Sequence, residues 1–229
     1  MPSQFGQDHL VLQLLNGKRD GFFLDTGAAD GIRSSNTELL ERAFGWRGLC
    51  VEPNTGFYDK LIRARRCTCL NACLYDRVAD LPFLEAAGTL GGLLNAFDPG
   101  QLAFAIKNQR LPVDAAGIPP LVTKRTMTIA TALTLAQAPP VIDYWSLDTE
   151  GSELLLLQSF PFDEHTFNVI TVEHNHQPAR VDIRRFLEAR GFVFVTAVFI
   201  DDCYVRAAAF PNLHSNSAAW RKRISRPAR

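Results

Sequence analysis

The chain has 229 residues, 47% of them hydrophobic and 21% charged, and its 24 basic and 24 acidic residues cancel to a formal charge of zero. This length is enough to close a large core, and the composition is that of a globular domain. Without the five basic residues of 221–229 the body holds 19 basic and 24 acidic residues, which argues against a nucleic-acid partner because such partners call for a basic face.

Strand-like and helix-like segments alternate along the chain, which is typical of a parallel sheet wrapped by helices. The predicted strands are 21–27, 48–53, 67–75, 141–148 and 167–175, and the predicted helices are 36–46, 55–65, 131–138, 153–160 and 179–191. Residues 192–210 follow as two strands joined by a tight turn at 200–202, so one strand must run antiparallel to the others. The sequence predicts a single α/β domain over 1–220 with a Rossmann-like sheet and helices on both faces.

Two regions lie outside this alternation. Residues 76–125 are too rich in glycine and proline for regular elements throughout, and a crossover of this length predicts a lid or a substrate wall. An edge strand is predicted at 123–129, which overlaps the end of this region. The basic end 221–229 is interpreted as a disordered, solubilising tail, with a nucleic-acid or membrane arm as the alternative.

The sequence also bears on cellular location. The first fifteen residues have neither the basic start nor the apolar stretch of a signal peptide, and no apolar run approaches the length of a membrane-spanning helix. Five cysteines suit a reducing compartment better than a disulfide framework, so we predict a cytoplasmic protein without a membrane span. The nearby Cys67, Cys69 and Cys73 are interpreted as buried strand cysteines rather than zinc ligands.

Polar residues follow the predicted parallel strands at their carboxyl ends, where open α/β sheets bind ligands. The residues at this edge are Asp25, Gly27, Gly31, Glu52, Asn71, Asp148, Glu150, Glu173 and His174. Because the carboxyl ends of parallel strands share one edge, these side chains are expected to surround one site.

The turn after the first strand, "LDTGAADG", indicates the kind of ligand. A carboxylate at Asp25 would repel the diphosphate of a dinucleotide, but it suits a cation such as the α-amino group of S-adenosylmethionine. Glu52, at the tip of the next strand, is placed to accept both hydroxyls of a ribose. The structural alternatives are a turn or N-cap aspartate at Asp25 and a solvated strand end at Glu52.

Six segments together resemble the FkbM-like family of S-adenosylmethionine-dependent methyltransferases: "SQFGQD" (3–8), "FFLDTGAADG" (22–31), "SSNTELLE" (34–41), "GWRGLCVEP" (45–53), "VIDYWSLDTEGSELLLLQSF" (141–160) and "VITVEHN" (169–175). The resemblance leaves 76–125 and the basic tail outside. It implies a seven-stranded methyltransferase sheet with the last strand reversed, S-adenosylmethionine as cofactor, and a hydroxyl of a sugar or secondary metabolite as acceptor. Asn36 lies in the matching "SNT" segment. The cofactor-binding candidates are therefore Asp25, Gly27, Gly31, Asn36, Glu52, Asn71 and Asp148.

The carboxylates of "LDTEGSE" are expected to face the cofactor and the acceptor. Asp148 is assigned to both, Glu150 to the substrate, and Glu153 to a structural role in the first turn of the following helix. Removing a hydroxyl proton calls for a base, for which His174 is the first candidate and Asp148 and Glu173 are rivals.

Two further points stay open at this stage. His176 is a substrate-binding candidate, although solvated histidines in a loop explain "VEHNHQP" about equally well. A divalent ion such as Mg²⁺ on Asp148, Glu173 and one of these histidines is an alternative route to an activated hydroxyl.

Other functions compete with O-methylation of a hydroxylated small molecule. Methylation of RNA or a nucleobase amine often uses an Asn/Asp-Pro-Pro-aromatic turn where this chain has "DTEG". A catalytically silent, cofactor-binding scaffold domain would keep Asp25 and Glu52. An NAD-dependent reductase is disfavoured by Asp25.

Overall fold

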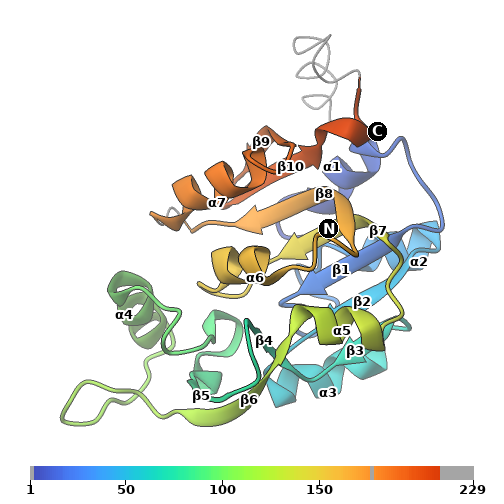
Figure 1. The fold of residues 1–229 in the computed structure, drawn as a ribbon. Coiled ribbons are helices and arrows are strands. Elements are labelled where there is room, and N and C mark those ends of the chain that lie inside the picture. Colours follow the sequence, from blue (N-terminus) through green and yellow to red (C-terminus); the bar gives the residue numbers. More distant parts are fainter. Residues whose placement is uncertain (1–2, 176–177, 212–229) are drawn as a thin grey trace.

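The structure is a computed structural model that describes residues 3–175 and 178–211. The predicted candidate His176 and the basic end 221–229 lie outside the described residues. A seven-stranded sheet crosses the molecule, and a smaller sheet with its own helix projects beside it (Figure 1). In the described ranges, no helix is both long and apolar enough to cross a membrane.

The strands of the large sheet run in the order β3-β2-β1-β7-β8-β10-β9. All pairs among the first five are parallel, whereas β10 is antiparallel to both of its neighbours. This confirms the predicted sheet, in which the last strand is reversed. The bounds are β1 Phe22–Thr26, β2 Arg47–Val51, β3 Thr68–Leu70, β7 Val141–Leu147, β8 Thr166–Glu173, β9 Phe192–Val198 and β10 Asp201–Arg206.

Both faces of this sheet are covered because its central strands are apolar on both sides. Along β1, Phe22 and Leu24 enter one core together with α5, α6 and α7, while Phe23 enters a second core with α1, α2 and α3. The helices are α1 Gln7–Leu14, α2 Glu38–Phe44, α3 Thr55–Ala64, α5 Ile129–Leu135, α6 Glu153–Ser159 and α7 Ala179–Glu188. Side chains on β1 therefore alternate between two buried layers until the strand ends at the site.

The segment predicted as one strand over 67–75 is divided between two sheets. After β3 the chain leaves the large sheet at Asn71, and β4 (Cys73–Tyr75) starts a small sheet of order β4-β6-β5. The Asn71 amide donates to the carbonyl oxygens of Glu52 (2.8 Å) and Pro53 (3.3 Å), which fixes the point of departure. Apolar content alone could not reveal this break.

The region 76–125 is more regular than its composition predicts. It contains β5 (Asp80–Phe83), the 3-10 segment η1 (Glu85–Leu90), α4 (Pro99–Asn108) and the start of β6 (Val122–Thr128). Asp98 caps α4 by accepting hydrogen bonds from the backbone N–H groups of Gly100 and Gln101. The prediction of an edge strand at 123–129 was wrong in position, since β6 lies in the centre of the small sheet between β4 and β5.

The turn of the final hairpin was also predicted one residue late. Asp201 and Asp202 already belong to β10, and Asp201 pairs with Val198, so the connecting residues are Phe199 and Ile200. Phe199 has a φ of 59°, in the left-handed region that turns of this length require. A short 3-10 segment, η2 (Ala207–Ala209), follows β10.

Candidate active site

A cavity of about 1010 Å³ opens at the carboxyl ends of β1, β2, β7 and β8. Of the predicted site residues, Asp25, Gly27, Asn36, Glu52, Asp148, Glu150 and Glu173 line it. The region 76–125 supplies further lining from η1 and α4, including Thr89 and Gln101. Most of the residues predicted at the strand ends therefore lie together at one site, as a parallel sheet requires.

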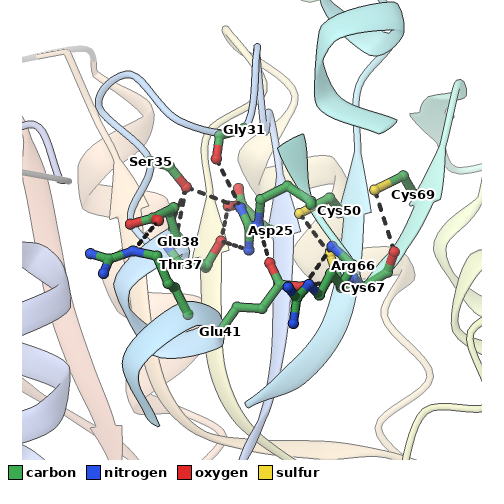
Figure 2. A network of polar contacts seen from close by, with 12 residues as sticks. Asp25, Gly31, Ser35, Thr37, Glu38, Glu41, Cys50, Arg66, Cys67 and Cys69 are labelled. Carbon is green, nitrogen blue, oxygen red and sulfur yellow. Dashed lines mark hydrogen bonds and ion pairs between the residues drawn. The ribbon is translucent and has the colours of Figure 1, made fainter. Parts of the chain in front are cut away.

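Asp25, at the end of β1, is buried and fixed from behind by a polar network (Figure 2). The Thr37 hydroxyl donates to Asp25 Oδ2 (2.6 Å), and Thr37 Oγ1 in turn accepts a hydrogen bond from Arg65 Nη2 (3.0 Å). Burial raises the pKa of Asp25 to about 6, although the Thr37 hydrogen bond and the Arg65 charge act in the opposite direction. A bound cation in front of Asp25 would favour its charged form.

Sequence reasoning missed Arg65, which organises this network. Its buried guanidinium forms an ion pair with Glu41 and also donates to Gly31 O (3.3 Å) and Ser35 Oγ (3.2 Å). It therefore ties the loop after β1 to α2 and to the end of α3. No signal marked it, because an arginine at the end of an amphipathic helix is ordinarily solvated.

Glu52 presents its carboxylate to the cavity from the end of β2. Oε2 accepts the Ala29 N–H (2.7 Å) and Oε1 accepts the Asn54 N–H (2.8 Å). Burial nevertheless raises the pKa of Glu52 to about 7. Each oxygen keeps a second lone-pair direction for an outside donor, as a ribose diol would require.

Two glycines were predicted at the turn after β1, and the structure explains both. A Cβ at Gly27, whose φ is +113°, would lie 2.0 Å from the carbonyl oxygen of Asp148. A Cβ at Gly31 would lie 2.6 Å from Leu61 Cδ1 and 2.8 Å from Arg65 Cγ. Gly27 thus allows the ends of β1 and β7 to approach, whereas Gly31 makes room for the arginine network.

Asn36 and Asn71 differ in what their amides do. Asn36 donates to Ser146 Oγ (3.0 Å), and its buried Oδ1 has no hydrogen-bond partner among the described residues. That acceptor lies in the cavity wall, where a bound donor could satisfy it. Asn71 is exposed, is not among the described lining residues, and supports the backbone of Glu52 instead.

Three carboxylates converge beyond β7 and β8. Asp148, Glu150 and Glu173 each offer an oxygen within 4.8 Å of the others. Burial and the neighbouring negative charges raise the pKa of Asp148 and of Glu173 well above their ordinary values, and the two side chains share a hydrogen bond. Burial and the Glu153 charge raise the pKa of Glu150 to about 7. The cluster is therefore built to keep a proton near neutral pH.

The loop that carries this cluster is held by Glu153. Its Oε1 accepts the Thr149 N–H (2.8 Å) and hydroxyl (3.1 Å), and both of its oxygens accept the Gly151 N–H at 3.1 Å. Glu153 is buried and is not among the described residues that line the cavity. This agrees with the structural role expected for it.

The structure separates Glu173 from its neighbour His174. Consecutive residues of a strand face opposite sides, and Glu173 lines the cavity whereas the described lining does not include His174. The His174 ring is buried, with Nε2 3.7 Å from Asp202 Oδ1, and Asp202 also pairs with Arg180. This arrangement favours Asp148 and Glu173 over His174 as the group that faces an acceptor.

Figure 2 shows three of the five cysteines, Cys50, Cys67 and Cys69, close to Asp25. Cys50 on β2 and Cys67 have their sulfur atoms 3.5 Å apart, and Cys69 donates to the Cys67 carbonyl. All five cysteines are free. Among the described residues, the acidic cluster is the only group of three or more side chains arranged to hold a metal ion, so the cysteines form no such group there.

A comparison with protein families agrees with this geometry. A model of the methyltransferase FkbM domain matches residues 25–194. The chain belongs to the FkbM methyltransferase family. The match runs through 76–125, which the resemblance in the sequence left outside, so the small sheet lies within the family's domain.

Solved structures with similarity to this FkbM-family chain share little sequence with it. A candidate RNA methyltransferase from Pyrococcus horikoshii is 12% identical, with 88% of this chain and 84% of that chain covered and a TM-score of 0.40. A precorrin-6y C5,15-methyltransferase from Geobacter metallireducens is 13% identical, with 86% and 85% covered and a TM-score of 0.40. A human methyltransferase 10 domain containing protein is 9% identical, with 90% and 83% covered and a TM-score of 0.40. No curated protein matched the chain.

Proposed function

We propose that this protein transfers the methyl group of S-adenosylmethionine to a hydroxyl of a small molecule. The observation that supports the proposal is a single cavity whose walls carry Asp25 and Glu52 at one end and Asp148 and Glu173 at the other. Its volume of about 1010 Å³ lies at the upper end of the roughly 300–1,000 Å³ found for small-molecule sites. Donor and acceptor therefore have room side by side.

Each part of the cofactor has a matching group. The two Glu52 oxygens, already fixed by backbone N–H groups, suit the paired hydroxyls of the ribose. The Asp25 carboxylate and the unpartnered Asn36 Oδ1 suit the protonated amine of the methionine end. Fixing these acceptors before the cofactor arrives limits the ordering that binding must cost.

In the reaction, the acceptor oxygen attacks the methyl carbon in line with the departing sulfur. The new C–O bond forms as the C–S bond breaks, S-adenosylhomocysteine leaves, and the hydroxyl proton passes to a carboxylate. Asp148 and Glu173 can take that proton because burial and mutual repulsion raise both pKa values. Most of the acceleration then comes from alignment of donor and acceptor.

A divalent ion is a second way to activate the hydroxyl. Three carboxylate oxygens within 4.8 Å of one another form an oxygen donor set of the kind that Mg²⁺ prefers. Asp148, Glu150 and Glu173 would hold the ion, which would lower the pKa of the acceptor hydroxyl.

The charge of the cavity favours a small acceptor over RNA. Its described lining contains seven acidic residues and a single basic one, Arg33; the acids are Asp25, Asp30, Glu52, Asp98, Asp148, Glu150 and Glu173. A phosphate backbone would meet repulsion along such a wall. A silent scaffold domain would have no use for a proton-holding carboxylate pair beside the cofactor.

Calorimetric titration of S-adenosylhomocysteine tests the proposal. We expect binding to the wild type and a loss of about tenfold or more in Asp25→Ala and Glu52→Ala, since each removes a buried acceptor of charged or hydroxyl donors. The matched control is Asp76→Ala, which removes an exposed carboxylate that pairs with the neighbouring Arg77 and lies outside the described cavity lining. Repeating the titration with EDTA and with Mg²⁺ shows whether a divalent ion changes the affinity. Absence of binding to the wild type under both conditions contradicts the proposal.

A further inference from the structure

An aromatic pair stands at the mouth of the cavity and has no role in the steps above. The rings of Phe5 and Phe199 stack with centroids 4.4 Å apart and planes inclined by 28°. Both residues line the cavity, yet they are 38% and 71% exposed. Packed aromatic rings normally lose most of their exposure, so this pair presents apolar surface to the opening.

The two rings come from distant parts of the chain and are fixed in place. Phe5 donates its N–H to Gln7 Oε1 (2.8 Å), and Gln7 Nε2 donates to Asp201 Oδ2 (2.8 Å) at the start of β10. On the other side, the Ile200 carbonyl next to Phe199 accepts the His174 N–H (2.8 Å). The pair is thus anchored to the start of β10 and to the end of β8, where Glu173 lies.

The backbone of Phe199 supports a role in binding. Its φ of 59° costs free energy in a bulky residue, and turn positions of this kind ordinarily use glycine or asparagine. Burial does not offset this cost, because the ring is 71% exposed. Strained residues of this sort concentrate where ligands are clamped.

We infer that the methyl acceptor carries a flat aromatic ring, which stacks against the Phe5–Phe199 pair while its hydroxyl faces Asp148 and Glu173. This inference rests on the proposed function and narrows its acceptor to phenol- or catechol-like compounds. The acidic wall agrees with it, since a phenolic hydroxyl is an uncharged donor with a proton to give to a carboxylate. It also makes Phe5 and Phe199 specificity-determining residues.

Two matched diols test the inference by NMR titration in the presence of S-adenosylhomocysteine and EDTA. Catechol has a flat ring, and cis-1,2-cyclohexanediol has the same two neighbouring hydroxyls on a puckered one; EDTA excludes binding through a chelated metal. We expect catechol to bind at least about fivefold more tightly than cyclohexanediol, which is the effect of one aromatic stacking contact. Equal binding, or no binding of catechol, overturns the inference.

Variants then assign the preference to the pair. Phe199→Asn and Phe5→Ala are expected to abolish the preference for catechol, whereas Val181→Ala, an exposed apolar residue on α7, leaves it unchanged. Asparagine tolerates a positive φ, so Phe199→Asn should melt at or above the wild-type temperature. A lower melting temperature with an unchanged preference would show that the pair is structural.

The same variants separate this inference from the function on which it rests. S-adenosylhomocysteine should bind Phe199→Asn and wild type with equal affinity. If the cofactor product binds but catechol shows no preference, only the acceptor class is wrong. If the cofactor product does not bind the wild type, the proposed function itself fails.

Discussion

The two ends of the cavity are built in opposite ways. At the Asp25–Glu52 end, Glu52 accepts two backbone N–H groups, and Asp25 accepts the Thr37 hydroxyl, to which the buried Arg65 donates in turn. At the Asp148–Glu173 end, the carboxylates of Asp148, Glu150 and Glu173 face one another, and burial and these like charges raise the pKa of Asp148 and of Glu173 well above their ordinary values. Hydrogen-bond donors therefore hold the carboxylates at the first end, whereas repulsion between like charges accumulates at the second.

This difference suggests a division of labour. A donor that is the same in every cycle can be met by a preformed, fully hydrogen-bonded site. A centre that has to take up a proton needs groups whose pKa values differ from their ordinary ones, and repulsion supplies that shift. We therefore expect substitutions at the first end to cost stability and cofactor affinity, and neutralising substitutions at the second to raise stability at the expense of activity.

The largest effect is expected where the two ends meet. Gly27→Ala would place a Cβ 2.0 Å from the Asp148 carbonyl oxygen at a φ of +113°, so β1 and β7 would have to separate. We expect a loss on the order of 5 kcal/mol in the free energy of unfolding, measured by chemical denaturation. Gly17→Ala is the control: its φ is +68° but no atom lies within 4 Å, so it should cost only about 1 kcal/mol. Equal losses would show that the contact can relax.

Removing Arg65 should come next. Arg65→Met leaves the half-buried Glu41 without its ion-pair partner and the Thr37 hydroxyl oxygen without its donor, and we expect a loss of about 3 kcal/mol. The cofactor product should also bind more weakly, because Asp25 loses its support. Arg63→Met, on the exposed side of α3, should change stability by less than about 0.5 kcal/mol. If both variants behave alike, Arg65 does not brace the site.

The pH dependence of stability tests buried carboxylates at both ends of the cavity. Glu150, Glu52 and Asp25 have pKa values raised to about 7, 7 and 6, so between pH 4 and 7 the folded state binds more protons than the unfolded state. The contribution of these three groups to stability is therefore full below their ordinary pKa values and is lost as the pH rises towards 7. Glu150→Gln should flatten this fall by about 3 kcal/mol. Denaturation at a series of pH values measures it, and a steeper fall in the variant would contradict the assignment.

The smallest effect is expected at Asn71. Asn71→Ala removes two hydrogen bonds to the backbone at the end of β2 and should cost about 1 kcal/mol of stability. Affinity for S-adenosylhomocysteine should change less than about threefold, since Glu52 keeps its own partners. A complete loss of binding would instead support the sequence-based prediction that Asn71 contacts the cofactor.

The positions of site residues could be predicted from the sequence where a polar residue follows directly at the end of a parallel strand. Asp25, Glu52, Asp148 and Glu173 could be found because a parallel sheet gathers its carboxyl ends at one edge. The sequence was a poor guide where side chains act from elsewhere: Arg65 reaches the site from the end of a helix, and no periodicity marks an arginine as buried. The small sheet was missed because β4 and β6, more than forty residues apart in the chain, pair through contacts that no local pattern encodes.

The position of β10 has a consequence for how the molecule is assembled. β10 follows β9 in the chain, yet it pairs with β8 on one side and with β9 on the other. The Gln7 side chain hydrogen-bonds to Asp201, which lies 194 residues later in the chain. Pairings of such long range form slowly because loop closure comes first. During synthesis β8 and β9 therefore keep an open edge until residues 201–206 are available. Since Glu173 pairs with Asp201, the Asp148–Glu173 end of the cavity is completed last, after the Asp25–Glu52 end already has its strands.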